Sequence, residues 1–357
     1  MSIHGPDLGA FSGPICVTGG SGFIGSHVVR RLLELGREVR CLVMAGDNAP
    51  ALQGLDVVQV TGDLLDGPSL DRAMDGCELV IHLAAIYALW LPEPELMHRV
   101  NVDGTREVLR AALRAGVKRV VHTSSIAAVG CLDGTAVADE ATLFDDWTTA
   151  DPYVMSKVLS EREALRALYR EDMEVVVVNP AFPFGARDIG PTPTGNLILS
   201  LMRGELPFVM QGGFNAVDVK DVAEGHLLAA ERGRSGERYL LAGHNLSYSA
   251  FAADIARLCQ VRGPLLSLPR GLLLKLGSAA ERGAHILRRP PLFTRGSIAM
   301  TAGRFLYFDT TKAESELGYR PGPLEAAFTD AITWFKSPEN PHNTEHITTR
   351  ARQLLRL

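Results

Sequence analysis

Apolar and polar positions form regular blocks along the first half of the chain. Six short apolar runs predict β-strands, and they cover residues 14–18, 38–44, 57–61, 79–85, 119–123 and 175–178. Between them lie stretches with apolar residues at helical spacing, of which 95–115 and 152–169 are the longest. Strands that are apolar throughout are typical of a parallel sheet covered on both faces. The pattern therefore predicts the α/β class, with a Rossmann-type doubly wound parallel sheet.

The pattern changes after the last of these strands. Asn179 and Pro180 are followed by a loop rich in proline and glycine, and beyond residue 195 the predicted elements are shorter and less regular. We predict an NAD(P)-binding Rossmann domain over residues 14–180, to which later segments return. A smaller C-terminal substrate-binding lobe is expected over 181–335, and a polar tail over 336–357.

A glycine-rich turn joins the first predicted strand to the first predicted helix. Gly19 allows a sharp turn, Gly22 allows backbone N–H groups to approach a phosphate, and Gly25 allows the helix to pack closely on the strand. A helix N-terminus favours negative charge through its unpaired N–H groups and its dipole. The turn therefore predicts a binding site for a dinucleotide pyrophosphate.

Composition and charge exclude several other classes of protein. The formal net charge of -5 is spread without long runs of like charge, so we expect no nucleic-acid partner. The five cysteines are scattered and outside any metal-ligand spacing, which favours a reducing compartment and no metal site. No run is long enough to span a membrane, and residues 1–13 do not resemble a signal peptide. We therefore expect a cytoplasmic protein.

Ser125, Tyr153 and Lys157 are the candidate catalytic residues. Tyr153 and Lys157 lie four residues apart on a predicted helix and therefore share one face. Ser125 ends a predicted strand, and strand ends and helix starts converge on one edge of a doubly wound sheet. Tyrosine is a poor base near neutral pH unless a nearby cation lowers its pKa, and Lys157 supplies that cation. We expect Ser125 to bind the substrate oxygen while Tyr153 moves the proton.

Several motifs in this order resemble the extended short-chain dehydrogenase/reductase family, also called the NAD-dependent epimerase/dehydratase family. The resemblance extends from about Ile15 to Phe335. It rests on the glycine-rich turn, Gly62-Asp63-Leu64, His82-Leu83-Ala84-Ala85, Asn101-Val102-Asp103-Gly104-Thr105, Thr123-Ser124-Ser125, Tyr153-Val154-Met155-Ser156-Lys157, Asn179-Pro180 and Asp221-Val222-Ala223. It implies an enzyme that acts on CH–OH groups with an NAD(P)(H) cofactor.

The resemblance also implies which residues contact this cofactor. They are Gly19, Gly22, Phe23, Ile24, Gly25, Asp63, Leu64, Leu83, Ala84, Ala85, Asn101, Thr123, Tyr153, Lys157, Pro180 and Phe182. Asp63 and Leu64 would contact the adenine, and Lys157 would also bind the nicotinamide ribose. Asn101 is expected to support the strand edges and the cofactor site, with a helix N-cap as the alternative.

The end of the second predicted strand bears on the choice between NAD and NADP. Members that use NAD commonly carry an acid there, and reductases that use NADP often carry an arginine. This chain has Val43 and Met44. Because no cation is placed for a 2′-phosphate, the sequence favours NAD, and Arg37 and Arg40 are the cations that would reverse this choice.

Three subgroups of the family are similar: dihydroflavonol reductase-like enzymes, 3β-hydroxysteroid dehydrogenase-like enzymes and hopanoid-associated sugar epimerases. Sugar-nucleotide members bind a diphosphate through arginines in the smaller lobe, where this chain has Phe214 and Asn215. Its lobe is rich in apolar residues instead. We predict interconversion of a secondary alcohol and a ketone on a bulky apolar substrate, such as a sterol, hopanoid or polyphenol, contacted by Tyr87, Ser125 and Phe182.

Two other functions stay open at this point. One is a nucleotide-sugar epimerase or dehydratase that holds NAD tightly, and the other is a cofactor-binding regulatory protein without catalysis. The resemblance also implies a homodimer that pairs through the helices at 95–115 and 152–169. Residues 272–289 have the pattern of a cationic amphipathic helix, which fits either peripheral contact with a membrane surface or packing on the small lobe.

Overall fold

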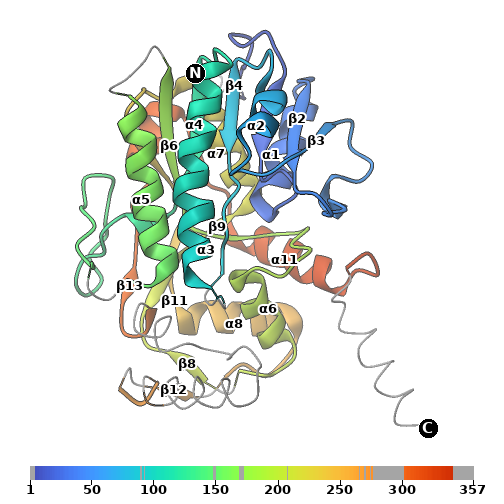
Figure 1. The fold of residues 1–357 in the computed structure, drawn as a ribbon. Coiled ribbons are helices and arrows are strands. Elements are labelled where there is room, and N and C mark those ends of the chain that lie inside the picture. The colour runs from blue at the N-terminus through green and yellow to red at the C-terminus, as the bar shows by residue number, and fades with distance from the viewer. Residues whose placement is uncertain are drawn as a thin grey trace.

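A seven-stranded sheet forms the centre of the computed structural model, which describes residues 5–88, 91, 93–147, 150–168, 173–206, 208–264, 266–268, 271–273, 275 and 301–340 (Figure 1). All its strands run parallel, in the order β10-β6-β5-β4-β1-β2-β3. They are β1 (Ile15–Thr18), β2 (Val39–Val43), β3 (Val58–Thr61), β4 (Leu79–His82), β5 (Arg119–Thr123), β6 (Glu174–Pro180) and β10 (Arg238–Leu241). The predicted fold class is confirmed, and the first six strands lie at the six apolar runs.

Helices cover both faces of this sheet. They are α1 (Phe23–Glu34), α2 (Gly67–Met74), α4 (Gly104–Arg114), α5 (Pro152–Ala167) and α7 (Val219–Arg232). Helices α1 and α7 pack together on one face, whereas α2, α4 and α5 cover the other, with α4 and α5 side by side (Figure 1). Consecutive strand residues point to opposite faces, so Val17 joins the first core and Cys16 the second.

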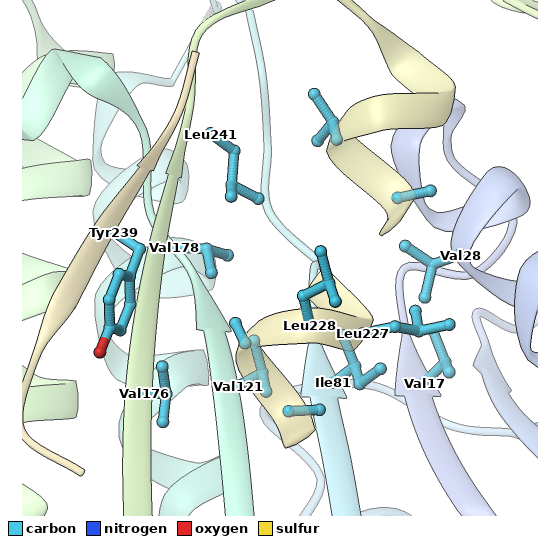
Figure 2. Close-up of a cluster of buried hydrophobic side chains, with 14 of the residues drawn as sticks. Val17, Val28, Ile81, Val121, Val176, Val178, Leu227, Leu228, Tyr239 and Leu241 are labelled. Carbon is cyan, nitrogen blue, oxygen red and sulfur yellow. The ribbon is translucent and has the colours of Figure 1, made fainter. Parts of the chain in front are cut away.

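The core between the sheet and helices α1 and α7 consists of buried, mostly aliphatic side chains (Figure 2). It includes Val17, Val28, Ile81, Val121, Val176, Val178, Leu227, Leu228, Tyr239 and Leu241. Burying a Val or Leu side chain stabilises a fold by about 1.5–3 kcal/mol. This core therefore holds the strands firmly, and the loops at their carboxyl ends start from fixed positions.

The helix predicted over 95–115 is wrong in one respect, because the structure interrupts it. It contains α3 (Pro94–His98), a π-helical turn over Arg99–Asp103, and then α4. Within that turn the Asn101 side chain bonds the backbone of Ile86, the segment that follows β4. Apolar periodicity does not reveal this wider turn, because the buried positions still recur at nearly helical spacing.

The C-terminal part of the chain forms two small sheets and further helices. Strands β11-β9-β13 form one sheet with β7 beside β9, and β12 pairs with β8. The bounds are β7 (Phe182–Phe184), β8 (Phe208–Met210), β9 (Gly213–Asp218), β11 (His244–Ser247), β12 (Leu266–Leu268), β13 (Phe305–Leu306), α6 (Pro193–Met202), α8 (Tyr248–Cys259) and α11 (Leu324–Lys336). Short helical turns lie at Pro50–Leu52, Ile126–Ala128 and Ala313–Leu317. The division at residue 180 stays a prediction, and α7 and β10 are the later segments that join the first sheet.

Some predicted segments cannot be compared with the structure. Most of the predicted amphipathic helix over 272–289 and most of the tail over 336–357 lie outside the described residues. Within the described ranges, no helix combines the length and the apolar character needed to cross a membrane. The same ranges contain no group of three or more His, Cys, Asp or Glu residues that could hold a metal ion.

Candidate active site

The glycine-rich turn after β1 has the geometry that its spacing predicts. Gly19 has a φ of +74°, and a Cβ at this position would lie 2.6 Å from the backbone nitrogen of Ala84. A Cβ on Gly25 would lie 2.0 Å from the carbonyl oxygen of Gly19. Both distances are shorter than non-bonded atoms allow, so these positions accept only glycine while the turn keeps its shape.

The N-terminus of α1 lies open at this turn. Gly22 is its N-cap residue, no side chain caps the helix, and its first turn contains no acidic residue. Gly22, Phe23 and Ile24 all line one cavity at this edge of the sheet. Free backbone N–H groups and the helix dipole both favour an anion here. The residues present therefore fit the pyrophosphate of a dinucleotide cofactor.

This cavity has a volume of about 520 Å³ and brings together most of the predicted site residues. Those that line it are Gly19, Gly22, Phe23, Ile24, Gly25, Leu83, Ala85, Tyr87, Thr123, Ser125, Tyr153, Lys157, Pro180 and Phe182. They come from the carboxyl ends of β1, β4, β5 and β6 and from the start of α5, and the loop after β6 continues into β7. The turn and the candidate catalytic residues therefore share one cavity.

Four predicted cofactor residues do not line this cavity. Ala84 packs directly against Gly19, while Asp63 is exposed and Leu64 is buried beneath Gly104 of α4. Asn101 is buried, and its side chain bonds the backbone N–H and C=O of Ile86 and the hydroxyl of Ser156. Asn101 therefore fixes the segment after β4 against α5, and its contact with a cofactor stays a prediction.

Ser125, Tyr153 and Lys157 converge on the cavity. Ser125 hydrogen-bonds the Tyr153 side chain, and its hydroxyl oxygen also accepts the Ala127 N–H at the short turn after β5. The Lys157 ammonium donates to the Thr123 carbonyl oxygen at 3.0 Å. Tyr87 lies beside Tyr153, with ring centroids 5.0 Å apart. One hydroxyl, one phenol and one ammonium are thus arranged around the same space.

Burial shifts the pKa values of Tyr153 and Lys157. It raises the pKa of Tyr153 to about 12, while the hydrogen bond with Ser125 acts in the opposite direction. It also lowers the pKa of Lys157 to about 8, and the nearby carboxylate of Glu161 opposes that shift. The sequence predicts that Lys157 lowers the pKa of Tyr153, whereas in this structure burial is the largest influence and raises it. Burial therefore favours the protonated form of Tyr153.

Glu161 is a buried residue that the sequence did not single out. It lies one turn beyond Lys157 on α5, is 5% exposed, and accepts hydrogen bonds from Ser124, Asn179 and Arg238. Asn179 also donates to the carbonyl oxygen of Ser125 at 2.9 Å. Glu161 therefore links the strand end that carries Ser125 to the helix that carries Lys157. The spacing Lys157-x-x-x-Glu161 was the available signal, because residues four apart share a helix face.

Charged side chains that the sequence patterns do not single out also line the cavity. Arg304, next to β13, forms an ion pair with Asp146 of the loop between β5 and α5. Asp145 and Asp151 line the cavity as well, together with Lys157. The described lining therefore contains three carboxylates, those of Asp145, Asp146 and Asp151, and two cations, Lys157 and Arg304. The Arg304 guanidinium is already paired with Asp146.

Phe182, one of the expected substrate contacts, is held in place by aromatic packing. Phe182 lines the cavity and packs edge-to-face on Phe214, with ring centroids 5.2 Å apart. Phe214 and Asn215, the positions at which sugar-nucleotide members carry arginines, are buried and lie off the cavity. Phe184 is likewise in the core. Part of the apolar character of the lobe therefore stabilises the fold.

The residues that follow β2 bear on whether the cofactor carries a 2′-phosphate, that is, on the choice between NAD and NADP. Met44 is exposed, as expected for a residue past the strand end, but Arg37 and Arg40 are engaged elsewhere. Arg37 donates to carbonyl oxygens of the N-terminal segment, and Arg40 to those at the end of α2. Asp47, three residues beyond Met44, accepts a hydrogen bond from Ser21 of the glycine-rich turn at 3.0 Å. An acid near the glycine-rich turn therefore stands at Asp47, a few residues after the positions at which the sequence shows Val43 and Met44.

A dinucleotide turn beside a half-buried serine and tyrosine and a buried lysine defines a nicotinamide-dependent oxidoreductase. The model of the NAD dependent epimerase/dehydratase family matches residues 15–242. The chain belongs to this family, and it is an NAD(P)-dependent enzyme.

Known relatives match nearly the whole chain. A putative dihydroflavonol 4-reductase of Synechocystis is 39% identical, and the match covers 90% of this chain and 94% of the relative. Sterol demethylase protein B of Methylococcus capsulatus is 34% identical, with 90% and 97% covered. The crystal structure of gox2253 is 38% identical and has a TM-score of 0.82, with 91% of this chain and 98% of that chain covered.

Proposed function

We propose that this enzyme interconverts a secondary alcohol and a ketone on a neutral, bulky, apolar substrate such as a sterol. The observation that carries the proposal is the convergence of Ser125, Tyr153 and Lys157 on a cavity whose described arginine is already paired. The sterol-related and dihydroflavonol-related names of two relatives support the same substrate class. The assembled catalytic group also speaks against a purely regulatory role.

The charges of the cavity favour a neutral substrate over a nucleotide sugar. A diphosphate needs cations to compensate its charge, and family members that bind one use arginines in the smaller lobe. Here Arg304 is held by Asp146, while Asp145 and Asp151 add negative charge to the lining of the same cavity. Like charges brought together in a cleft repel each other. An uncharged alcohol avoids this cost.

The residues divide the chemistry between them. Ser125 and Tyr153 together hold the substrate oxygen, because their hydroxyl groups already meet at the cavity. Tyr153 donates its proton to the carbonyl oxygen during reduction and takes it back during alcohol oxidation. The Lys157 ammonium stabilises the phenolate that forms when Tyr153 gives up its proton. The nicotinamide cofactor, when bound, supplies or accepts the hydride.

Asp47 supports a preference for NAD over NADP. Its carboxylate is hydrogen-bonded to Ser21 of the glycine-rich turn, and a carboxylate there repels a 2′-phosphate while it can accept hydrogen bonds from ribose hydroxyls. Arg37 and Arg40 do not offset this charge, since backbone carbonyl oxygens hold them elsewhere. A homodimer, peripheral membrane contact and a cytoplasmic location are also proposals, which rest on the family resemblance and the sequence pattern.

The test is turnover of added cofactor by the purified protein. We expect NADH formation with a 3β-hydroxysterol and NAD, and a weaker response with NADP. In parallel, melting temperature is measured with a UDP-sugar, for which we expect no shift. A UDP-sugar that raises the melting temperature, together with no response to any sterol or polyphenol alcohol, would replace this proposal with the epimerase.

A further inference from the structure

A second cavity of about 50 Å³ lies in the C-terminal lobe between α6, α8 and β8, which gather below the large sheet in Figure 1. Its described lining is apolar except for one phenol. The lining residues are Leu197, Leu201, Leu206, Phe208, Val209, Met210, Tyr248, Phe251, Ala252 and Leu273. Several of them, such as Val209 and Met210, are only half-buried although they are apolar. The described residues therefore leave room for further apolar cover.

One face of α6 lines both cavities. The cavity of about 520 Å³ that Ser125, Tyr153 and Lys157 line is called the catalytic cavity from here on. Pro193 lines the first cavity, whereas Leu197 and Leu201 line the second. Residues four apart lie on the same helix face, about 6 Å from each other along the axis. The two cavities are therefore neighbours along a continuous apolar stripe.

A thin wall of side chains separates the cavities at another point. Thr301 lines the catalytic cavity and hydrogen-bonds Tyr248, and its hydroxyl lies 3.9 Å from the sulfur of Met210. Tyr248 and Met210 both line the second cavity. A flexible methionine at such a boundary can change rotamer to admit a ligand. Two independent contacts thus connect the catalytic space to the second cavity.

We propose that the second cavity binds the end of the hydrocarbon tail of the substrate whose alcohol or ketone lies beside Tyr153. This inference rests on the proposed function, because it assigns the far end of the same substrate. The described lining offers no charged group and one phenol, already hydrogen-bonded to Thr301, so a saturated chain is the ligand that matches it. The catalytic cavity must hold both the cofactor's reactive end and the substrate's rings, so the tail needs this additional space.

The first experiment compares two sterols that differ only in the tail. Cholesterol carries a branched hydrocarbon tail, and androst-5-en-3β-ol has the same rings without it. We expect kcat/KM to be higher for cholesterol by tenfold or more, since each buried methylene strengthens binding by roughly fourfold. The same comparison is repeated as a melting-temperature shift with Tyr153→Phe protein and NADH, which reports binding without turnover.

The second experiment fills the second cavity with a larger side chain. Val209→Phe adds volume at the second cavity, and Leu206→Phe does so from the other side, in case one variant folds poorly. Both should remove most of the advantage of cholesterol, by about tenfold in kcat/KM, and leave androst-5-en-3β-ol within twofold. Val58→Phe makes the same change on an exposed position of β3, outside both cavities, and should alter neither sterol.

The outcomes separate this inference from the proposed function. If neither sterol is turned over but the tail still gives a larger melting shift that Val209→Phe removes, the tail site stands and the proposed function fails. If both sterols are oxidised equally and Val209→Phe changes neither, the proposed function stands and the tail site is overturned.

Discussion

Two helices begin at the catalytic cavity, and their N-termini are built in opposite ways. Helix α1 starts after Gly22 with no side-chain cap and no acid in its first turn. Helix α5 starts after Asp151, whose carboxylate accepts the N–H of Val154 at 2.9 Å, and it has proline in its first turn. The first end keeps its N–H groups for a ligand, whereas the second uses one of them for its own cap.

This difference matches what each end has to do. An anion can bind at α1 through backbone groups alone, so that side needs glycine and space. The start of α5 has to present particular side chains, Tyr153 and Lys157, so it is closed and packed. Behind it, Glu161 accepts three side-chain hydrogen bonds and ties the helix to the end of β5 and to β6. Cofactor binding and proton transfer should therefore respond separately to substitution.

The largest effect is expected from Tyr153→Phe, which removes the proton donor and leaves the α1 end unchanged. Ketone reduction in a single turnover should slow by roughly 100- to 10,000-fold, because general acid catalysis contributes that much. The measurement is the decay of NADH absorbance after mixing with ketone. Tyr307→Phe removes a phenol that does not line the cavity and should leave the rate unchanged. A Tyr153→Phe enzyme as fast as the wild type would refute the mechanism.

Glu161→Gln should have an intermediate effect, visible in the pH profile. Lys157 has a pKa lowered to about 8 by burial, and the Glu161 carboxylate partly opposes this shift. Ketone reduction should therefore decline above about pH 8 as the Lys157 ammonium loses its proton. Without the Glu161 charge the pKa of Lys157 falls further, so the decline should begin about one pH unit lower. The measurement is kcat for reduction between pH 6 and 10.

The other groups near Lys157 do not cancel this expectation. Burial lowers the pKa values of His82 and His122, so both rings stay neutral in that range. Arg238 loses its buried partner in the variant and pushes the Lys157 pKa in the same direction. Glu163→Gln is the matched control, because Glu163 pairs with Arg106 and Arg166 near the surface. A profile that moves equally in both variants would contradict a special role for Glu161.

The smallest effect is expected from Asp151→Ala, which opens the N-terminus of α5. Loss of an N-cap costs about 1 kcal/mol in the free energy of unfolding. Urea unfolding at neutral pH measures it. Asp151→Asn keeps a hydrogen-bond acceptor and should restore most of the stability. An alanine variant as stable as the wild type would show that this cap does not hold the helix in place.

Most strands of the large sheet, the glycine-rich turn and the candidate catalytic residues could be predicted, because each depends on residues that are close together in the sequence. The apolar runs gave the strands of the sheet up to β6, and Gly19 and Gly25 occupy positions at which a Cβ has no room. Tyr153 and Lys157 share a helix face, so their meeting needs no long-range information. Ser125 follows from its place at the end of β5, since strand ends of a parallel sheet share one edge.

The remaining features depend on contacts between distant segments. Glu161 accepts hydrogen bonds from Ser124 just after β5, from β6 and from β10, and nothing in its local sequence indicates that Arg238 lies beside it. Arg304 and Asp146 are 158 positions apart in the chain. The π-helical turn around Asn101 arises because its side chain bonds Ile86. The hydrogen bond between Ser21 and Asp47 likewise joins two separate loops, and the family pattern around Val43 and Met44 does not indicate it.

The most direct test of the contrast between the two helix N-termini is NADH binding, measured by fluorescence titration of Gly25→Val and Tyr153→Phe side by side. A valine at Gly25 brings a Cβ to 2.0 Å from the Gly19 carbonyl oxygen and must displace the turn, so this variant should bind NADH at least tenfold more weakly. Tyr153→Phe should bind within about twofold of the wild type, because it loses one hydroxyl group while the glycine-rich turn and Lys157, which supply the other expected cofactor contacts, stay in place. Tight NADH binding by a folded Gly25→Val protein, with loss of binding in Tyr153→Phe, would contradict the account.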